Sequence, residues 1–253
     1  MNARVARWLG AHPEWAGAEV EELGGGRSNR AWRLSTPRRQ GVLKLDAGGR
    51  DWPGNSRAEE AHVQQAAAEA GLAAPVLWHS AEGILTGWLD GASLDRAALR
   101  DESVLRKIGV RLRELHALEA TERHFDFARW SAHYRDLLTA SGHFDRSASD
   151  ACALLERVSL PGPRVLSHND LVPANILAGD RLRFLDWEYA ATNSWLFDLA
   201  TLCVEGALSA DDTAVLFDAY AKGTDAPPAL ADAVMVYRQL VMLWEKSRLP
   251  AVS

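Results

Sequence analysis

The chain has 253 residues, of which 28 are Lys or Arg and 34 are Asp or Glu, so its formal charge is −6. This acidic balance argues against a dedicated nucleic-acid-binding protein, whose affinity comes from neutralising phosphates. The sequence has no apolar run near the ~18 residues of a membrane-spanning helix and no signal segment. Its two cysteines, Cys152 and Cys203, fit a reducing compartment. We therefore expect a cytoplasmic protein that binds neither membranes nor nucleic acid.

Several common catalytic motifs are absent. The four lysines never follow a glycine, so the sequence has no Walker A loop. His-Glu-x-x-His, Gly-x-Ser-x-Gly and Gly-x-Gly-x-x-Gly do not occur either. These absences argue against zincins, serine hydrolases with a nucleophile elbow, and ordinary dinucleotide-binding proteins.

Residues 1–88 are predicted to form a small domain of mixed α and β structure. A glycine-rich segment over 24–29 separates two short strands and a third strand follows, which is the pattern of an antiparallel sheet. An alanine-rich helix without Gly or Pro is expected over 57–70, ending at Gly71. The other expected elements are a short amphipathic helix and five strands, over 4–9, 21–23, 31–34, 41–45, 76–79 and 84–89.

From residue 89 to residue 253 the hydrophobic pattern becomes mainly helical. Helices are predicted over 104–118, 147–158, 211–222 and 229–247. One β segment interrupts them, with strands predicted over 165–167, 175–177 and 182–186. The predicted fold class is α+β, with a small antiparallel β lobe followed by a larger helical lobe. Such a layout leaves a cleft at the connector, where ligands tend to bind.

Polar residues of chemical interest concentrate around this inserted hairpin. Asn175 is expected to begin its first strand and Asp186 to end its second. Paired strands lie about 5 Å apart, so the two oxygen-bearing side chains are expected to meet at the open end. Hard oxygen ligands of this kind suit Mg²⁺, which completes its shell with phosphates and water. Asp170, on the preceding loop, could accept a proton from a substrate hydroxyl.

Each of these residues also has a structural interpretation. A single Asp or Asn in a loop is most often a turn former or a helix cap. His168 is expected to be a buried, hydrogen-bonded structural residue. Lys44 could be a solvated strand lysine, and the glycine-rich segment could be a simple turn. The occurrence of Asp170, Asn175 and Asp186 around one hairpin nevertheless argues for a functional site.

The same strings resemble the choline/ethanolamine kinase family and its wider clan of aminoglycoside phosphotransferases and thiamine kinases. The resemblance covers most of the chain and implies a two-lobed protein-kinase-like fold. It rests on the segments 23–30, 42–45, 57–60, 167–175, 185–190 and 197–200, and on Glu205.

The resemblance implies roles for the residues in these strings. Kinases of this fold mainly position the γ-phosphate of ATP and neutralise its charge. Asp170 is then the catalytic base, and Asn175 and Asp186 hold Mg²⁺. Lys44 contacts the α and β phosphates and is oriented by Glu60, with Glu59 as the alternative partner. The nucleotide-covering loop contributes Gly25, Gly26, Ser28 and Asn29.

The resemblance also implies a pocket for a cationic acceptor. Aromatic faces beside carboxylates attract quaternary ammonium groups. The residues expected to line this pocket are Glu188, Tyr189, Glu205 and Trp244. The family often has two Trp spaced by three, and here Val241 stands where the first would fall. Asp198 is expected to brace the catalytic loop.

We therefore expect an ATP- and Mg²⁺-dependent kinase that phosphorylates a hydroxyl of a small cationic metabolite, with choline or a related amino alcohol as first candidate. Thiamine and aminoglycosides remain alternative acceptors. A nucleotide-binding pseudokinase or regulatory module is the alternative of another class. The intact set of predicted catalytic and nucleotide-binding residues argues against it: Lys44, Glu60, Asp170, Asn175 and Asp186.

Overall fold

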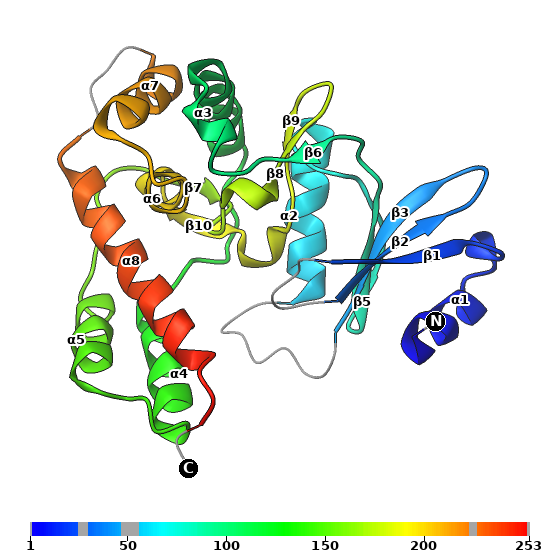
Figure 1. Cartoon of the computed structure of the whole chain (residues 1–253), viewed down its shortest axis with the longest axis horizontal. Helices are drawn as coiled ribbons and strands as arrows, with labels where there is room; N and C mark the ends of the chain where they lie inside the picture. The colour runs from blue at the N-terminus through cyan, green and yellow to red at the C-terminus, as the bar shows by residue number, and fades with distance from the viewer. Residues whose placement is uncertain (1, 25–29, 47–55, 223–226, 252–253) are drawn as a thin grey trace. The chain divides into compact units, whose positions relative to one another are not determined.

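The computed structural model describes residues 2–24, 30–46, 56–222 and 227–251 (Figure 1). These residues form two compact units, one ending at Gly91 and the other beginning at Ala92. The boundary predicted from the sequence lies at residue 88. No helix in the described ranges is long and apolar enough to cross a membrane.

The first unit is built on a five-stranded antiparallel sheet with the order β1-β2-β3-β5-β4. Each of the five predicted strands is present, with small shifts at the ends. The strands are β1 (Glu19–Leu23), β2 (Arg30–Ser35), β3 (Gln40–Leu45), β4 (Val76–Ser80) and β5 (Gly83–Gly87).

One face of this sheet forms the core of the unit together with helix α1 (Ala3–Ala11). The cluster contains Val5, Trp8, Trp15, Trp32, Leu34, Leu43, Leu45 and Leu85. Successive side chains of a strand point to opposite faces. Lys44, between Leu43 and Leu45 on β3, therefore points away from this core.

Helix α2 (Arg57–Glu69) completes the first unit and packs against β4 and β5. It begins at Ser56, whose hydroxyl accepts the N–H of Glu59 in a normal N-cap. Its end is set by Gly71, which has a φ of 70° that glycine adopts without strain. The predicted helix and its stop at Gly71 are confirmed.

The second unit is mainly helical (Figure 1). In it α3 packs on α7, α6 packs on α8, and α4 packs on α5. Two of these helices, α4 and α6, were not predicted from the hydrophobic pattern. The helices are α3 (Glu102–His116), α4 (Phe127–Ala140), α5 (Arg146–Leu155), α6 (Leu196–Glu205), α7 (Ala210–Ala221) and α8 (Ala229–Ser247).

Short strands lie between the helices of the second unit. They form one antiparallel pair, β10-β7, and one three-stranded sheet, β6-β8-β9. The strands are β6 (Ala92–Ser93), β7 (Arg164–Ser167), β8 (Ile176–Ala178), β9 (Leu182–Phe184) and β10 (Ala191–Ser194).

The predicted hairpin is present, but its ends differ from the expectation. Asn175 closes a 3₁₀ turn over Pro173–Asn175 instead of beginning a strand, because its N–H donates within the turn to the carbonyl of Val172 at 2.9 Å. Asp186 lies beyond the second strand, since its φ of 66° is left-handed rather than extended. The ladder still reaches this point, because the N–H of Leu185 donates to the carbonyl of Asn175 at 2.8 Å.

Helices α3 and α7 approach each other closely at Gly109. A Cβ atom at this position would lie 2.7 Å from the carbonyl oxygen of Leu216 and 3.0 Å from the nitrogen of Tyr220. Both atoms belong to the backbone of α7, so they cannot turn away as a side chain could. Glycine at 109 is therefore required by the spacing of the two helices.

We expect Gly109→Ala to lower the free energy of unfolding by about 1–3 kcal/mol through overpacking, although Ala is the better helix former. Gly10→Ala, in helix α1, is the matched control because a Cβ there meets nothing within 4 Å. Urea denaturation should show a lower free energy of unfolding for Gly109→Ala and an unchanged one for Gly10→Ala. Equal curves for the two variants would contradict the close helix contact.

Candidate active site

The loop after β7 carries His168, Asn169 and Asp170. It begins where Ser167 pairs with Ala191 of β10. Asn169 has a φ of 64°, and a left-handed conformation costs a residue other than glycine about 1 kcal/mol or more. Asp170 follows directly, so the direction of its carboxylate depends on how Asn169 is held.

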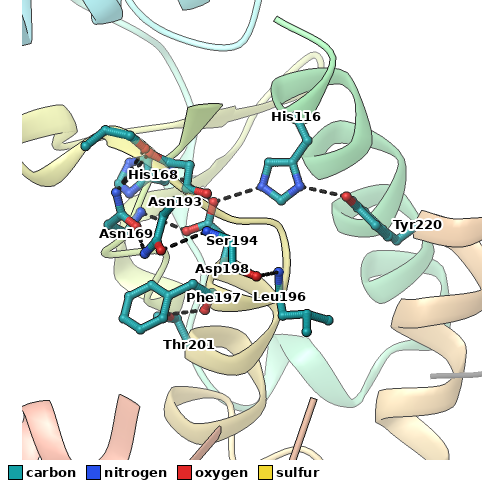
Figure 2. A network of polar contacts seen from close by, with 12 residues as sticks. His116, His168, Asn169, Asn193, Ser194, Leu196, Phe197, Asp198, Thr201 and Tyr220 are labelled. Atoms are coloured by element: carbon teal, nitrogen blue, oxygen red, sulfur yellow. Dashed lines mark hydrogen bonds and ion pairs between the residues drawn. The ribbon is translucent and has the colours of Figure 1, made fainter. Parts of the chain in front are cut away.

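Asp198, in the first turn of α6, holds this loop (Figure 2). Its carboxylate accepts the backbone N–H of His168 and that of Asn169, each at 2.8 Å. Complete burial raises the pKa of Asp198, but the hydrogen bonds and charges of His116 and His168 hold that pKa below its usual value. The loop is therefore fastened by two hydrogen bonds to an ionised acceptor, which are stronger than neutral ones.

The Asn169 side chain adds further hydrogen bonds. Its Nδ2 donates to the carbonyl of Tyr189 at 3.0 Å, and its Oδ1 accepts from Nδ2 of Asn193 at 2.8 Å. Nε2 of His168 lies 2.9 Å from the carbonyl oxygen of Leu185 and donates to it. These bonds connect the loop to β10 and to the chain on either side of Asp186. His168 is fully buried, as expected of a structural residue.

Asp170 lies among other acidic groups. Burial is the main cause that raises the pKa of Asp170 well above its usual value, and the charges of Asp186 and Glu188 raise it further. Nδ2 of Asn175 donates to the Asp170 carboxylate at 3.0 Å and partly offsets this rise in pKa. The structure thus brings together the predicted base, the two predicted metal ligands and Glu188.

This donor set fits a hard divalent cation. Carboxylates that raise one another's pKa favour a cation that neutralises them, and Asn175 adds an amide group beside Asp170. Within the described ranges, no group of three or more His, Cys, Asp or Glu side chains could hold a metal by itself. The residues therefore suit an ion such as Mg²⁺, which takes one or two carboxylates and completes its shell with phosphate and water.

Aromatic rings stand beside the acidic group. The ring centroid of Trp130 lies 5.8 Å from that of Tyr134 and 5.8 Å from that of Tyr189. Burial raises the pKa of both tyrosine hydroxyls. The charge of Asp170 raises both pKa values further, so both hydroxyls lie near its carboxylate and keep their protons.

The other two predicted acceptor residues differ in their surroundings. The hydroxyl of Tyr237 donates to Glu205 at 3.2 Å, and the charge of Glu205 contributes to the raised pKa of Asp170. Glu205 therefore belongs with the acidic group. Trp244 lies further along α8, where the guanidinium of Arg248 stands 5.1 Å from its ring centroid. One face of the Trp244 ring is therefore already in contact with the guanidinium of Arg248.

One nucleotide-binding residue predicted in the first unit, Glu60, pairs with a buried arginine. Arg57 donates to the Glu60 carboxylate at 2.7 Å and also pairs with Asp46, which directly follows β3 and its Lys44. Glu60 is buried, whereas Glu59 is exposed and accepts from the hydroxyl of Ser56. The predicted loop residues lie outside the described residues: Gly25, Gly26, Ser28 and Asn29.

Comparison with protein families gives one match that covers most of the chain. The model of the phosphotransferase enzyme family matches residues 19–233. The chain belongs to this family. The phosphotransferase is 33% identical over 184 residues to Protein LicA of Haemophilus influenzae, which covers 67% of this chain and 68% of that protein.

Solved structures agree with this membership. A choline/ethanolamine kinase family protein from Mesorhizobium loti is 26% identical, with a TM-score of 0.73 over 95% of this chain and 84% of that one. The choline kinase LicA from Streptococcus pneumoniae is 20% identical, with a TM-score of 0.82 over 98% and 91%. The phosphotransferase therefore has the two-lobed protein-kinase-like fold that the sequence resemblance predicts.

Sequence reasoning missed several residues of this phosphotransferase that touch the loop or stand beside the acidic group. Trp130 and Tyr134 lie on α4, whose buried positions recur at helical spacing and could have indicated the helix. His116 and Asn193 have no such signal, because their partners come from distant segments. Nδ2 of Asn193 lies 2.8 Å from Asn169, and Nε2 of His116 lies 3.1 Å from Asp198.

The ion pairs of Arg57 predict a large effect on stability. Arg57→Met leaves two carboxylates without their common cation at a site where the arginine side chain is 1% exposed. Breaking a buried ion pair in this way costs about 3–5 kcal/mol. We expect the free energy of unfolding, measured by urea denaturation, to fall by this amount.

Arg30→Met is the control for this measurement. Arg30 pairs with Glu22 at 3.8 Å, but the two side chains are 67% and 56% exposed. An exposed pair of this kind contributes little, so this variant should unfold close to the wild-type midpoint. Similar losses for the two variants would mean that the Arg57 pairs do not hold α2 to the end of β3.

Proposed function

We propose that this phosphotransferase transfers the γ-phosphoryl group of ATP to a hydroxyl of a small cationic metabolite, with choline or a related amino alcohol as the acceptor. The observation that carries the proposal is the grouping around Asp170. The carboxylates of Glu188 and Glu205 and the rings of Tyr134 and Tyr189 all lie near it. Quaternary ammonium groups bind where aromatic faces and negative charge combine.

The relatives support the same class of acceptor. The pneumococcal structure of similar fold is named a choline kinase, and the Mesorhizobium loti structure is named a member of the choline/ethanolamine kinase family. A third structure of this fold is named LicA in complex with AMP, with a TM-score of 0.79. These names agree with an adenine nucleotide as the phosphoryl donor.

In the proposed reaction Asp170 orients the acceptor hydroxyl and receives its proton as the oxygen attacks the γ-phosphorus, while the bond from the γ-phosphorus to the bridging oxygen breaks and ADP leaves. Asp186 and Asn175 would hold Mg²⁺, which supplies positive charge that offsets the phosphate oxygens. Lys44 would contact the α and β phosphates, and Glu60 would orient it. Glu188, Glu205 and Tyr189 would hold the cationic end of the acceptor, while Trp244 would complete the pocket wall beside Arg248.

Acceptor identity is tested by incubating the protein with ATP and Mg²⁺ and each of choline, ethanolamine, thiamine and an aminoglycoside. Phosphorus NMR identifies the phosphorylated product directly. We expect phosphocholine or phosphoethanolamine to form fastest. Product from thiamine or the aminoglycoside alone would show that the acceptor belongs to that other class of compound. ATP binding without any product would favour a pseudokinase.

Asp170→Asn separates a catalytic base from a structural loop residue. The substitution keeps the shape and the contact with Asn175 but removes the proton acceptor. We expect kcat to fall about 10²- to 10⁴-fold, with little change in nucleotide affinity measured by calorimetry. If nucleotide binding is lost together with turnover, Asp170 acts as a metal ligand or as a structural residue.

Glu205→Gln tests the cationic acceptor. The amide oxygen of Gln can still accept from Tyr237, so the pocket keeps its shape and loses one negative charge. An attraction of about 0.5–2 kcal/mol corresponds to a rise of roughly 2- to 30-fold in the KM for choline. The KM for ATP should remain unchanged in the same kinetic assay.

Two controls accompany Glu205→Gln. The first is 3,3-dimethylbutanol, a neutral acceptor with the shape of choline, which should react poorly and equally with both proteins. The second is Glu119→Gln, which changes an exposed carboxylate and should leave the KM for choline unchanged. An unchanged KM for choline in Glu205→Gln would remove Glu205 from the acceptor site.

A further inference from the structure

The contacts that hold the Asp170 loop continue away from it through His116. Nε2 of His116 lies 3.1 Å from Asp198, and Nδ1 lies 2.8 Å from the hydroxyl of Tyr220 (Figure 2). His116 is the last residue of α3, Asp198 lies on α6 and Tyr220 lies on α7. Three helices that are distant in sequence therefore meet at one imidazole, whose side chain is 3% exposed.

These contacts fix the orientation of the imidazole ring. An ionised Asp198 can only accept, so Nε2 of His116 must donate to it. Burial, and then the charge of Asp198, raise the pKa of the Tyr220 hydroxyl, which therefore keeps its proton. Nδ1 and the Tyr220 hydroxyl form a second hydrogen bond on the other side of the ring, so the tyrosine holds the ring with Nε2 directed at Asp198.

From this geometry we infer that Tyr220 is a positioning residue for phosphoryl transfer, although it lies on a helix that contributes no residue to the proposed site. Its hydroxyl holds the ring of His116 in place, His116 holds Asp198, and Asp198 holds Asn169 in the left-handed conformation that directs Asp170. Without that hydroxyl the imidazole is held at Nε2 alone and can turn away from the carboxylate. The inference rests on the proposed role of Asp170.

Tyr220→Phe removes the hydroxyl alone. The ring, whose centroid lies 5.6 Å from that of Trp195 and 6.3 Å from that of Phe217, keeps its place. We expect kcat to fall about 3- to 10-fold, as for the loss of one hydrogen bond. The KM values for ATP and for choline should each change less than about 2-fold, because a positioning residue contacts neither substrate.

Amide hydrogen exchange measured by NMR gives a second readout that needs no substrate. The N–H groups of His168 and Asn169 donate to Asp198, so they report directly on the loop. In Tyr220→Phe we expect both to exchange about 3- to 10-fold faster, with little change at other buried amides. Unchanged exchange and unchanged kcat would overturn the inference.

A double-mutant cycle shows whether Tyr220 acts through His116. His116→Leu keeps similar bulk and removes both hydrogen bonds. Adding Tyr220→Phe to this variant should have no further effect on kcat or on amide exchange in the loop, because the Tyr220 hydroxyl acts only through His116. An equal effect of Tyr220→Phe in both backgrounds would mean that it acts by packing, which overturns the inference.

Phe217→Leu is the control for packing. It alters the same helix and its contact with Trp195 but leaves the Tyr220 hydroxyl in place. We expect a lower melting temperature with normal kcat and normal exchange at His168. If Phe217→Leu matches Tyr220→Phe in these readouts, the hydroxyl has no special role.

The two readouts also distinguish this inference from the proposed function. Failure to phosphorylate any acceptor would overturn the proposed function, whereas loop exchange would still show whether Tyr220 holds the loop. Normal loop exchange in Tyr220→Phe, together with a large loss of kcat in Asp170→Asn, would overturn only the inference.

Discussion

Two backbone N–H groups in the second unit, those of His168 and Asn169, donate to the buried carboxylate of Asp198. An unpaired buried N–H costs about 1–3 kcal/mol. Asp198 thus compensates both amides and also offsets the strain of the left-handed Asn169. The direction of Asp170 follows from that conformation, so the proposed chemistry depends on a residue that touches no substrate.

Helix α6 connects this support to the acceptor side of the site. Asp198 lies in its first turn and Glu205 is its last residue. At 1.5 Å per residue the two are separated by about 10 Å along the axis. Most of the helix surface is buried. Six residues of its first two turns are apolar or small and lie in the core: Leu196, Phe197, Leu199, Ala200, Thr201 and Leu202. One rigid element therefore spaces the loop support from the carboxylate proposed to attract the cation.

The sequence predicted the parts of this arrangement that have local causes. Alternating residues indicated the five strands of the first unit, and Gly71 indicated the end of α2. The motif strings predicted which of the acidic residues lie near Asp170. Helix α6 was missed because its residues are apolar on nearly every face, so no amphipathic period marks it.

Other features depend on contacts between distant segments, which periodicity cannot reveal. The pairing of His116 with Asp198 and Tyr220 spans three helices. The stacking of Arg248 over Trp244 depends on side-chain direction. The positions of Asn175 and Asp186 just outside the hairpin strands follow from a proline turn and a left-handed residue. Spacing along the chain predicted that these two residues lie close, but their backbone conformations could not be inferred from it.

The most direct test of this account is a crystal structure of Asp198→Asn. This substitution keeps the side-chain shape and replaces one accepting oxygen with an amide group that cannot accept from the loop. We expect residue 169 to leave the left-handed region and the carboxylate of Asp170 to move away from Asn175. A loop that keeps its φ near 64° at Asn169, with Asp170 in place, would contradict the dependence of the site on Asp198.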